Sequence, residues 1–298
     1  MPSVRTMSII SRTFRGALLV FLAFPGLSAQ EVGPANGSLV IVGGAMRDPA
    51  IRERFVELAG GEDARIIVVP TAGGADEYDN GSCGVASWWR MGVESVTCLH
   101  TKDPAEANTD EFIGPIQNAT AIWFNGGRQW HIADSFLGTR TEEEFWKVLE
   151  RGGVIGGSSA GATIQGSYLV RGDTSGNTIM MGDHQIGFGY LKNTAIDQHV
   201  LRRNRQFDLI DVIETHPELL GIGIDENTAI VVQGDEFEVI GESLVLIYDN
   251  QKMVGDEGHF YFIPPGGKFN LSTREATRGG DNPRPIEGPQ PKAWPGRG

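Results

Sequence analysis

The amino-acid sequence predicts an α/β fold with a mostly parallel sheet and helices on both faces. Two patterns lead to this prediction. From residue 38 onward, short apolar runs rich in β-branched residues alternate with segments of helical spacing. Strands that are buried on both faces have this continuous apolar character. After residue 225 the runs become short, β-rich and separated by turn residues, which predicts an antiparallel β edge near the C-terminus.

The individual elements follow from this alternation. Helices are predicted at 51–58, 86–91 and 141–149, the last with Thr141 as its N-cap. Glycine pairs come at the ends of several predicted strands, and ligands of parallel sheets bind outside the carboxyl ends of the strands. We therefore expect one active-site rim at these glycines. The runs that predict strands are 39–44, 65–70, 95–99, 119–124, 194–200, 228–232, 236–240 and 244–248, and another begins at Val154.

Length and charge limit the classes of protein to consider. The chain has 298 residues, of which 40% are hydrophobic, and this suits one large or two small globular domains. The formal net charge of −13 argues against nucleic acid as a partner, because an acidic surface repels phosphates. Such a surface favours cationic substrates or simply keeps the protein in solution.

The first 29 residues predict a signal peptide. Three arginines precede an apolar stretch at 16–24, which is short for a membrane span, and small residues before Gln30 offer a cleavage site. An uncleaved membrane anchor is the alternative. We expect a secreted or periplasmic protein without membrane contact after cleavage. Its catalytic α/β domain would cover residues 30–270, followed by a Pro/Gly-rich tail at 271–298.

The chain contains two cysteines, Cys83 and Cys98. In an exported protein an isolated pair can form a disulfide, and two buried thiols are the alternative. Cys83 is expected to start a helix, and Cys98 lies in a predicted strand. The histidines and cysteines do not have the spacing of a zinc site, so we expect no metal and no cofactor.

The segment around Ser159 has the spacing of a nucleophile elbow. A predicted strand ends in Gly157-x-Ser159-x-Gly161, where small neighbours would allow a hydroxyl to lie on a sharp strand-to-helix turn. The N–H of Ala160 would then be available to a developing oxyanion. The alternative is a glycine-rich turn that binds a phosphate or only packs tightly.

A serine nucleophile needs a base and an acid that orients the base. His199 closes the strand-like run 194–200, so it is expected at the same rim, although it would also fit as a surface histidine. Asp225 or Glu226 ends the apolar run at 221–224 and could orient the imidazole. Asp173, in the loop after the elbow helix, is a competing acid.

Four motifs in this order carry a family resemblance: 124–129 (Phe-Asn-Gly-Gly-Arg-Gln), 156–162 (Gly-Gly-Ser-Ser-Ala-Gly-Ala), 197–199 (Asp-Gln-His) and 221–229 (Gly-Ile-Gly-Ile-Asp-Glu-Asn-Thr-Ala). From about residue 38 to 265, the chain resembles the cyanophycinase branch of the peptidase E-like serine peptidases. The resemblance implies a class I glutamine amidotransferase-like fold. It also implies Ser159 as nucleophile, His199 as base and Glu226 as acid, with the N–H groups of Gly127 and Ala160 as the oxyanion hole.

The resemblance also implies a substrate and its pocket. The substrate would be cyanophycin, a polyaspartate whose β-carboxyls carry arginines, and the products would be β-Asp-Arg dipeptides. A pocket for this unit must bind a carboxylate, which suits arginines, and a guanidinium, which suits Asp197 or the acidic surface. The arginines are expected on a helix after His199, but Asp208 stands where the family has a third one. The implied pocket residues are Gln129, Asp197, Gln198, Arg203 and Arg205.

Other expectations concern activity and assembly. An aspartyl or isoaspartyl dipeptidase of the peptidase E type is the second enzyme hypothesis, with a β-aspartyl peptide as substrate. A binding protein that keeps the fold without turnover is a third hypothesis. Members of the family often form dimers, so a homodimer is a further expectation.

Overall fold

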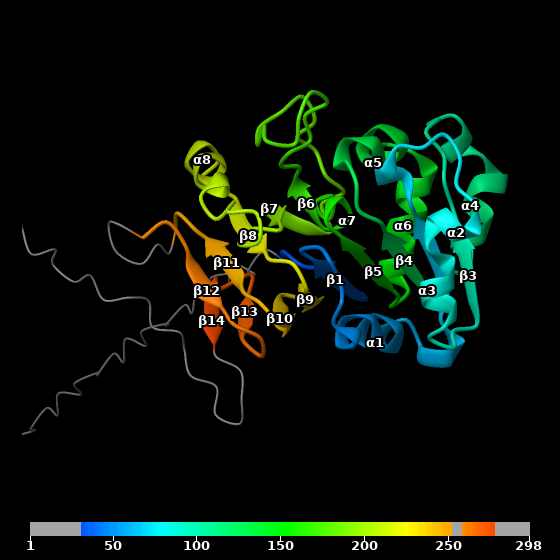
Figure 1. Cartoon of the computed structure of the whole chain (residues 1–298), viewed down its shortest axis with the longest axis horizontal. Coiled ribbons are helices and arrows are strands. Elements are labelled where there is room, and N and C mark those ends of the chain that lie inside the picture. The colour runs from blue at the N-terminus through cyan, green and yellow to red at the C-terminus, as the bar shows by residue number, and fades with distance from the viewer. Residues whose placement is uncertain (1–30, 252–257, 278–298) are drawn as a thin grey trace, which may run out of the picture.

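The computed structural model describes residues 31–251 and 258–277 (Figure 1). The predicted signal peptide at 1–29 and most of the predicted tail lie outside these residues. Within the two described ranges, none of the helices is long and apolar enough to cross a membrane.

The larger sheet has nine strands in the order β14-β13-β10-β9-β1-β5-β4-β2-β3. Its parallel half consists of β1 (Ser38–Val42), β5 (Val154–Ser158), β4 (Ala121–Phe124), β2 (Arg65–Val69) and β3 (Ser95–Cys98). Its antiparallel half consists of β9 (Thr228–Gln233), β10 (Glu236–Gly241), β13 (Lys268–Asn270) and β14 (Glu275–Thr277). The predicted fold class, including its antiparallel edge, is confirmed.

Alternation along the strands supplies a core on each face of this sheet. On β1, Val40 and Val42 face one core, whereas Leu39 and Ile41 face the other, as the two-residue repeat of a strand requires. The first core includes residues of α1 (Pro49–Leu58) and α3 (Val85–Trp89). The second includes residues of α4 (Asp110–Gln117), α5 (Gln129–Phe136) and α6 (Arg140–Glu150).

A second sheet of five strands was not predicted from the sequence. Its order is β12-β11-β8-β7-β6, and Figure 1 shows it to the left of the parallel strands. Its helix α8 (Asp208–Thr215) packs on one face through Leu209, Val212 and Ile213. The strands are β6 (Gly166–Tyr168), β7 (Leu191–Gln198), β8 (Leu220–Ile224), β11 (Val245–Tyr248) and β12 (Tyr261–Ile263).

The remaining elements are short. The helices α2 (Asn80–Cys83) and α7 (Ala160–Thr163) have four residues each. The described residues also include the 3₁₀ turns η1 (Gly61–Asp63), η2 (Thr71–Gly73) and η3 (Glu106–Asn108). Cys83 therefore ends a helix and does not start one. It forms a disulfide with Cys98, with Cα atoms 6.1 Å apart, so the two-thiol alternative does not apply.

Two further local predictions were wrong. The N-cap of α6 is Thr139, whose hydroxyl accepts the N–H of Glu142. Thr141 is buried instead and donates its hydroxyl to the carbonyl of Ala107 (2.6 Å). The predicted tail also begins too early, because Leu271 is buried and β14 pairs with β13 beyond residue 270.

Candidate active site

Ser159 lies at the turn between β5 and α7. Its backbone has φ 59° and ψ −112°, a sparsely populated conformation that the surrounding structure must hold in place. The two glycines of the motif make room for the turn. A Cβ on Gly157 would lie 2.3 Å from the carbonyl oxygen of Gly161, and a Cβ on Gly161 would lie 2.1 Å from that of Phe124. The G-x-S-x-G spacing therefore reflects close backbone packing around Ser159.

His199 follows β7 of the smaller sheet and joins it to the larger one. Its backbone N–H donates to the carbonyl of Gly43 (2.9 Å), directly after β1. Its Nε2 lies 2.9 Å from the Oγ of Ser159. The carboxyl end of β7 thus meets the carboxyl ends of β1 and β5, and the base candidate reaches the predicted rim from the second sheet.

Glu226 completes a chain of hydrogen bonds. It lies in the turn between β8 and β9, and its Oε1 is 2.8 Å from the Nδ1 of His199. An ionised carboxylate only accepts, so Nδ1 carries the proton and Nε2 is left to accept from the serine hydroxyl. The side chain of His199 is 7% exposed and that of Glu226 is 15% exposed, whereas Ser159 is half-buried.

The environment keeps the imidazole neutral. Burial lowers the pKa of His199, and the positive charges of Arg203 and Arg205 lower it further, while Glu226 acts in the opposite direction. The net effect is a pKa below the ordinary value of histidine. At neutral pH the ring is therefore in the form that accepts a proton, as a general base requires.

The two alternative acids have other partners. Asp225 accepts the backbone N–H groups of Leu201 (3.1 Å) and Arg202 (2.8 Å) through Oδ1, so it braces the turn after His199. Asp173 accepts the N–H of Ser175 (2.8 Å) in its own loop. Of the three candidate acids, Glu226 contacts the imidazole.

The candidate oxyanion-hole residues flank Ser159. Ala160 is the next residue and the first of α7. Gly127 lies in the turn after β4, where a Cβ on the preceding Gly126 would be 3.2 Å from the Cβ of Ser159. Gly127 itself has φ 151°, and a Cβ there would lie 2.1 Å from the carbonyl oxygen of Ala72. This position therefore requires glycine, and the residue before it, Gly126, lies beside the serine.

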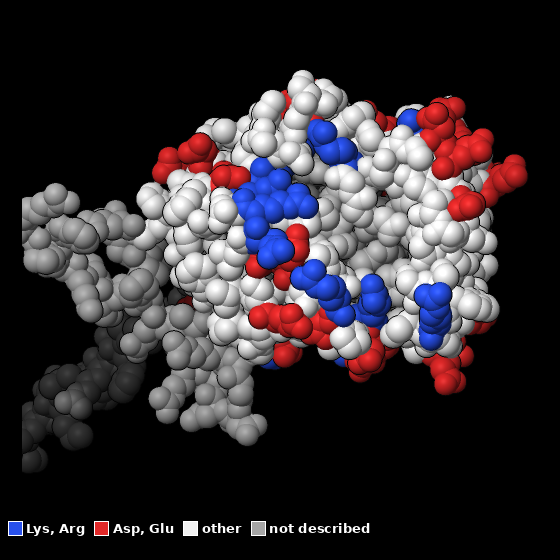
Figure 2. Space-filling model, viewed as in Figure 1, with Lys and Arg blue, Asp and Glu red and all other residues white. Residues whose placement is uncertain are grey.

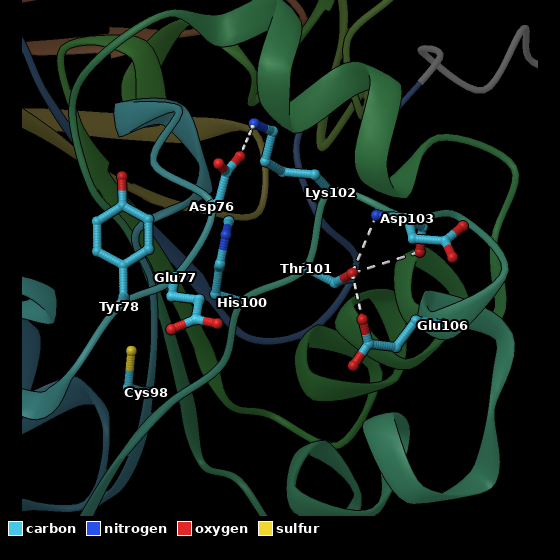
Figure 3. A pocket seen from close by; sticks show the side chains of 9 residues that line it. All are labelled: Asp76, Glu77, Tyr78, Cys98, His100, Thr101, Lys102, Asp103 and Glu106. Carbon is cyan, nitrogen blue, oxygen red and sulfur yellow. Dashed lines mark hydrogen bonds and ion pairs between the residues drawn. The ribbon is translucent and has the colours of Figure 1, made fainter.

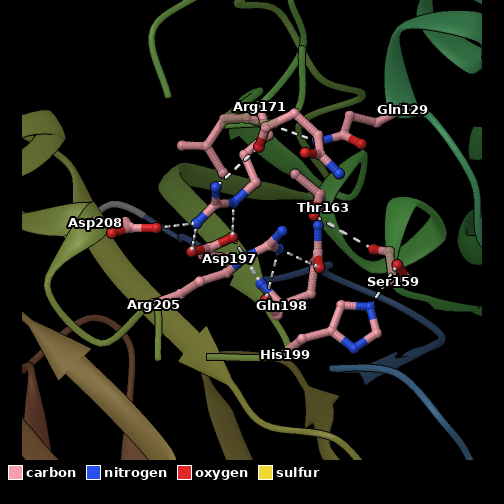
Figure 4. A network of polar contacts seen from close by, with 11 residues as sticks. Gln129, Ser159, Thr163, Arg171, Asp197, Gln198, His199, Arg205 and Asp208 are labelled. Atoms are coloured by element: carbon pink, nitrogen blue, oxygen red, sulfur yellow. Dashed lines mark hydrogen bonds and ion pairs between the residues drawn. The ribbon is translucent and has the colours of Figure 1, made fainter. Parts of the chain in front are cut away.

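Asp197 does not face an open pocket. Its side chain is fully buried, and a guanidinium holds both of its oxygens. Arg171 donates from Nε to Oδ1 (2.7 Å) and from Nη2 to Oδ2 (2.9 Å). Nη2 also donates to Oδ2 of Asp208 (2.6 Å), as Figure 4 shows. The expectation that Asp197 binds a substrate guanidinium is therefore wrong, because the protein's own arginine occupies it.

The other predicted pocket residues are spread over this network. Gln129 is buried and donates Nε2 to the carbonyl of Val170 (2.7 Å). Arg205 donates Nη1 to Oε1 of Gln198 (3.2 Å), and Arg203 is exposed. Both arginines lie in the turn before α8 and not on a helix, because α8 begins at Asp208.

Comparisons with known proteins identify the family of the chain. The model of Peptidase family S51 matches residues 39–240. This chain belongs to peptidase family S51. The S51 peptidase is 34% identical over 225 residues to a cyanophycinase of Geminocystis herdmanii (strain PCC 6308). This alignment covers 73% of this chain and 82% of that protein. It is also 32% identical over 225 residues to a cyanophycinase of Synechococcus elongatus, and this second alignment covers 72% of this chain and 68% of that protein.

A solved structure supports the same fold. The S51 peptidase superposes on the crystal structure of a peptidase from an acI-B1 Actinobacterium with a TM-score of 0.60 and 24% identity, over 81% of this chain and 98% of that one. At this identity the likeness shows the fold alone. Together with the family match, it identifies the chain as a serine peptidase with a mixed α/β fold.

Sequence reasoning missed two residues of the S51 peptidase site. Arg171 has the largest fully buried side chain of the described residues, but a lone arginine after an apolar run gives no signal of this. Asn227 follows Glu226 in the left-handed conformation, with φ 54°. Its Oδ1 accepts the N–H groups of Arg47 (2.7 Å) and Asp48 (2.6 Å), which ties the segment after β1 to the acid.

A separate pocket of the S51 peptidase lies where β2 and β3 end (Figure 3). It has a volume of about 720 Å³, and Ser159, His199 and Glu226 are not among its lining residues. His100, in its wall, contacts Thr71 through Nδ1 (2.9 Å) and the carbonyl of Ala75 through Nε2 (3.1 Å). This histidine is therefore held by structural contacts. The other lining residues are Asp76, Glu77, Tyr78, Cys98, Thr101, Lys102, Asp103 and Glu106.

Charge is unevenly distributed over the S51 peptidase. Although the net charge is −13, Figure 2 shows basic side chains across the middle of one face and acidic side chains mostly toward its margins.

Within the described ranges, no group of three or more His, Cys, Asp or Glu side chains is arranged to hold a metal ion.

Proposed function

We propose that this S51 peptidase is an exported serine exopeptidase that hydrolyses cyanophycin to β-Asp-Arg dipeptides. The observation that carries the proposal is the hydrogen-bonded series of Ser159, His199 and Glu226, with distances of 2.9 and 2.8 Å. The identity to two proteins named cyanophycinase supports the choice of substrate.

In the first half of the proposed reaction, Ser159 Oγ attacks the scissile carbonyl carbon while His199 Nε2 takes the hydroxyl proton. Glu226 accepts the Nδ1–H of His199 and stabilises the imidazolium that forms. The N–H groups of Gly127 and Ala160 would donate to the oxyanion of the tetrahedral intermediate. Collapse breaks the amide bond, and the leaving amine takes the proton from Nε2.

In the second half, water attacks the acyl-enzyme. His199 removes a proton from the water and returns it to Ser159 Oγ as the ester bond breaks. The lowered pKa of His199 supports this step, because the base must be neutral again before each attack.

The charge near the site suits a substrate with carboxylates. Arg203 is exposed and Arg205 is half-buried, and Arg205 uses Nη1 on Gln198, which leaves other donors of its guanidinium for a ligand. A guanidinium binds a carboxylate through paired hydrogen bonds. These two arginines therefore support recognition of the free α-carboxylate that each arginine branch of cyanophycin carries.

Export fits the proposed substrate. The Cys83–Cys98 disulfide is of the kind that persists in oxidising compartments, and this supports a secreted or periplasmic location. Cyanophycin is insoluble and too large to import, so a cell that scavenges it would have to degrade it outside.

The proposal is tested with purified protein and insoluble cyanophycin. Wild-type protein is expected to release β-Asp-Arg dipeptides, identified by mass spectrometry, and Ser159→Ala is expected to release none above background. Ser158→Ala is the matched control, because it removes the neighbouring hydroxyl and leaves the proposed nucleophile. Near-normal turnover by Ser159→Ala would refute the mechanism, and intact cyanophycin after incubation with wild-type protein would refute the substrate.

A dipeptidase acting on aspartyl or isoaspartyl dipeptides is the second candidate. The observation behind this candidate is the acid at position 208, where the resemblance leads us to expect an arginine, because a pocket with one cation fewer binds the carboxylates of the polymer less well. The same preparations are assayed on α-Asp and β-Asp dipeptides. Hydrolysis of these dipeptides without attack on the polymer would support the second candidate.

A further inference from the structure

Arg171 binds two carboxylates, those of Asp197 and Asp208, and the two differ in their exposure to solvent. Asp197 is 0% exposed and Arg171 is 1% exposed, whereas the side chain of Asp208 is 37% exposed. All three belong to one cluster, which connects at its other end to Gln198, His199 and Ser159 (Figure 4). Asp208 is therefore the member of the cluster that meets solvent.

The charges of this cluster do not cancel. Arg171 carries one positive charge and contacts two carboxylates, with Nε and Nη2 on Asp197 and Nη2 on Asp208. The fully buried pair of Arg171 and Asp197 is neutral as a unit, because an unpaired charge there would be costly. The excess negative charge consequently belongs to Asp208, where solvent or a ligand can reach it.

The charge of the neighbouring Arg205 acts on Asp208, but the guanidinium of Arg205 binds a different group. Arg205 directs its Nη1 to Gln198 (3.2 Å), although its backbone carbonyl accepts the N–H of Asp208 (2.9 Å). The strand end and turn at 197–208 thus present cationic groups at 203 and 205 and an anionic group at 208. A ligand with both a carboxylate and a cationic side chain would match this arrangement.

Arg171 holds the carboxylate in a fixed position. Its own guanidinium is anchored at three places, the third being the carbonyl of Asn177 (2.9 Å from Nη1). A carboxylate oxygen that is already placed loses less freedom when a ligand binds, which favours affinity. Only Oδ2 of Asp208 is used by Arg171, and a carboxylate has further acceptor sites on its other oxygen.

We propose that Asp208, held in place by Arg171, determines specificity by binding a cationic side chain of the substrate, the guanidinium of an arginine. This proposal rests on the proposed function and adds to it the group that recognises the arginine. It replaces Asp197 in that role, since Asp197 is occupied by Arg171. A charge-assisted hydrogen bond of this kind corresponds to a preference of about ten- to a hundredfold over a neutral side chain.

The test compares two synthetic oligomers, one of β-Asp-Arg units and one in which citrulline replaces each arginine. Citrulline keeps the shape of arginine and removes its charge. Wild-type protein is expected to prefer the arginine oligomer in kcat/KM by about tenfold or more. Asp208→Asn should remove most of this preference through a higher KM for the arginine oligomer, with kcat changed by less than about threefold. Its kinetics on the citrulline oligomer should stay unchanged.

Two further variants separate charge from structure. Asp208→Glu retains the carboxylate and is expected to retain part of the preference. Asp211→Asn removes an exposed acid from the same helix and is expected to leave the preference as in wild type. Thermal unfolding of each variant checks that the fold is intact.

The outcomes distinguish this inference from the proposed function. If Asp208→Asn weakens cleavage of both oligomers equally, or of neither, Asp208 has only a structural role and the inference is overturned while the proposed function stands. If wild-type protein cleaves neither these oligomers nor the polymer, the proposed function fails and the inference falls with it.

Discussion

The imidazole of His199 occupies the space that a side chain on Gly44 would need. A Cβ on Gly44 would lie 2.1 Å from Cε1 and 2.4 Å from Nδ1 of the ring. Gly44 also has φ 134°, a conformation that favours glycine. The segment after β1 therefore forms a wall against the ring, and Asn227 fixes that segment because its N–H donates to the carbonyl of Gly44 (2.8 Å).

Gly44→Ala should consequently displace the base. The new methyl group would push the ring away from both Ser159 and Glu226, and a misplacement of about 1 Å can cost about a hundredfold in rate. We expect kcat on cyanophycin to fall at least that far. Gly114→Ala is the matched control, because a Cβ at Gly114 in α4 would meet no atom within 4 Å. Equal activity of the two variants would contradict the steric argument.

The pH dependence of activity should respond to Arg203. Its positive charge disfavours the imidazolium and thus lowers the pKa of His199. Arg203→Gln removes that charge, so the pKa of His199 should rise. The acid limb of kcat/KM, which reports the free enzyme's base, should move to higher pH. The measurement is a pH profile of kcat/KM at low ionic strength, where screening is weakest.

Arg202→Gln serves as the control for this profile. Arg202 is also exposed, but its charge is not among the main influences on the pKa of His199, so its removal should shift the limb less. A limb that stays in place in Arg203→Gln, or moves to lower pH, would show that this charge does not act on the base.

The part of the site that the sequence predicts is the part set by local structure. Ser159 lies on a sharp turn that small neighbours make sterically possible, so the G-x-S-x-G spacing is visible within five residues. His199 and Glu226 each follow an apolar run, and the ends of such runs meet at one rim in an α/β fold. The resemblance added the choice between Asp225 and Glu226, which position alone left open.

The part that escaped prediction depends on contacts between distant segments. Arg171 and Asp197 are 26 positions apart. Nothing in the sequence of either segment indicates that the guanidinium of Arg171 binds the carboxylate of Asp197. The second sheet was missed for a similar reason. An apolar run predicts a strand, but it does not indicate the sheet in which that strand pairs. The N-cap at Thr139 was missed because Thr141 has the same residue type, and only packing against Ala107 separates them.

The disulfide should contribute to stability more than to activity. Cys83 and Cys98 are 15 positions apart, and closing a loop of this length stabilises the folded state by about 3 kcal/mol in the chain-entropy model. A reductant should lower the free energy of unfolding by about that amount, measured by urea titration. The double variant Cys83→Ala/Cys98→Ala should be insensitive to reductant. Identical titrations of wild-type protein with and without reductant would contradict the prediction.

The three acids near the site should give three different results when each is changed. Glu226→Ala removes the acceptor of the His199 Nδ1–H, and loss of the orienting acid in a serine triad lowers kcat by about 10⁴-fold. Asp173→Asn should leave kcat near wild type, because its carboxylate binds N–H groups of its own loop.

Asp225→Asn should act mainly on stability, because Asp225 also accepts the hydroxyl of Ser243 (2.7 Å) in addition to two backbone N–H groups. A loss of buried hydrogen bonds to a charged group costs about 1.5–3 kcal/mol, and thermal unfolding would measure it. Single-turnover kinetics on the three folded variants then assign the acid. A larger loss of kcat in Asp173→Asn than in Glu226→Ala would transfer the role to Asp173, against the 2.8 Å contact between Glu226 and His199.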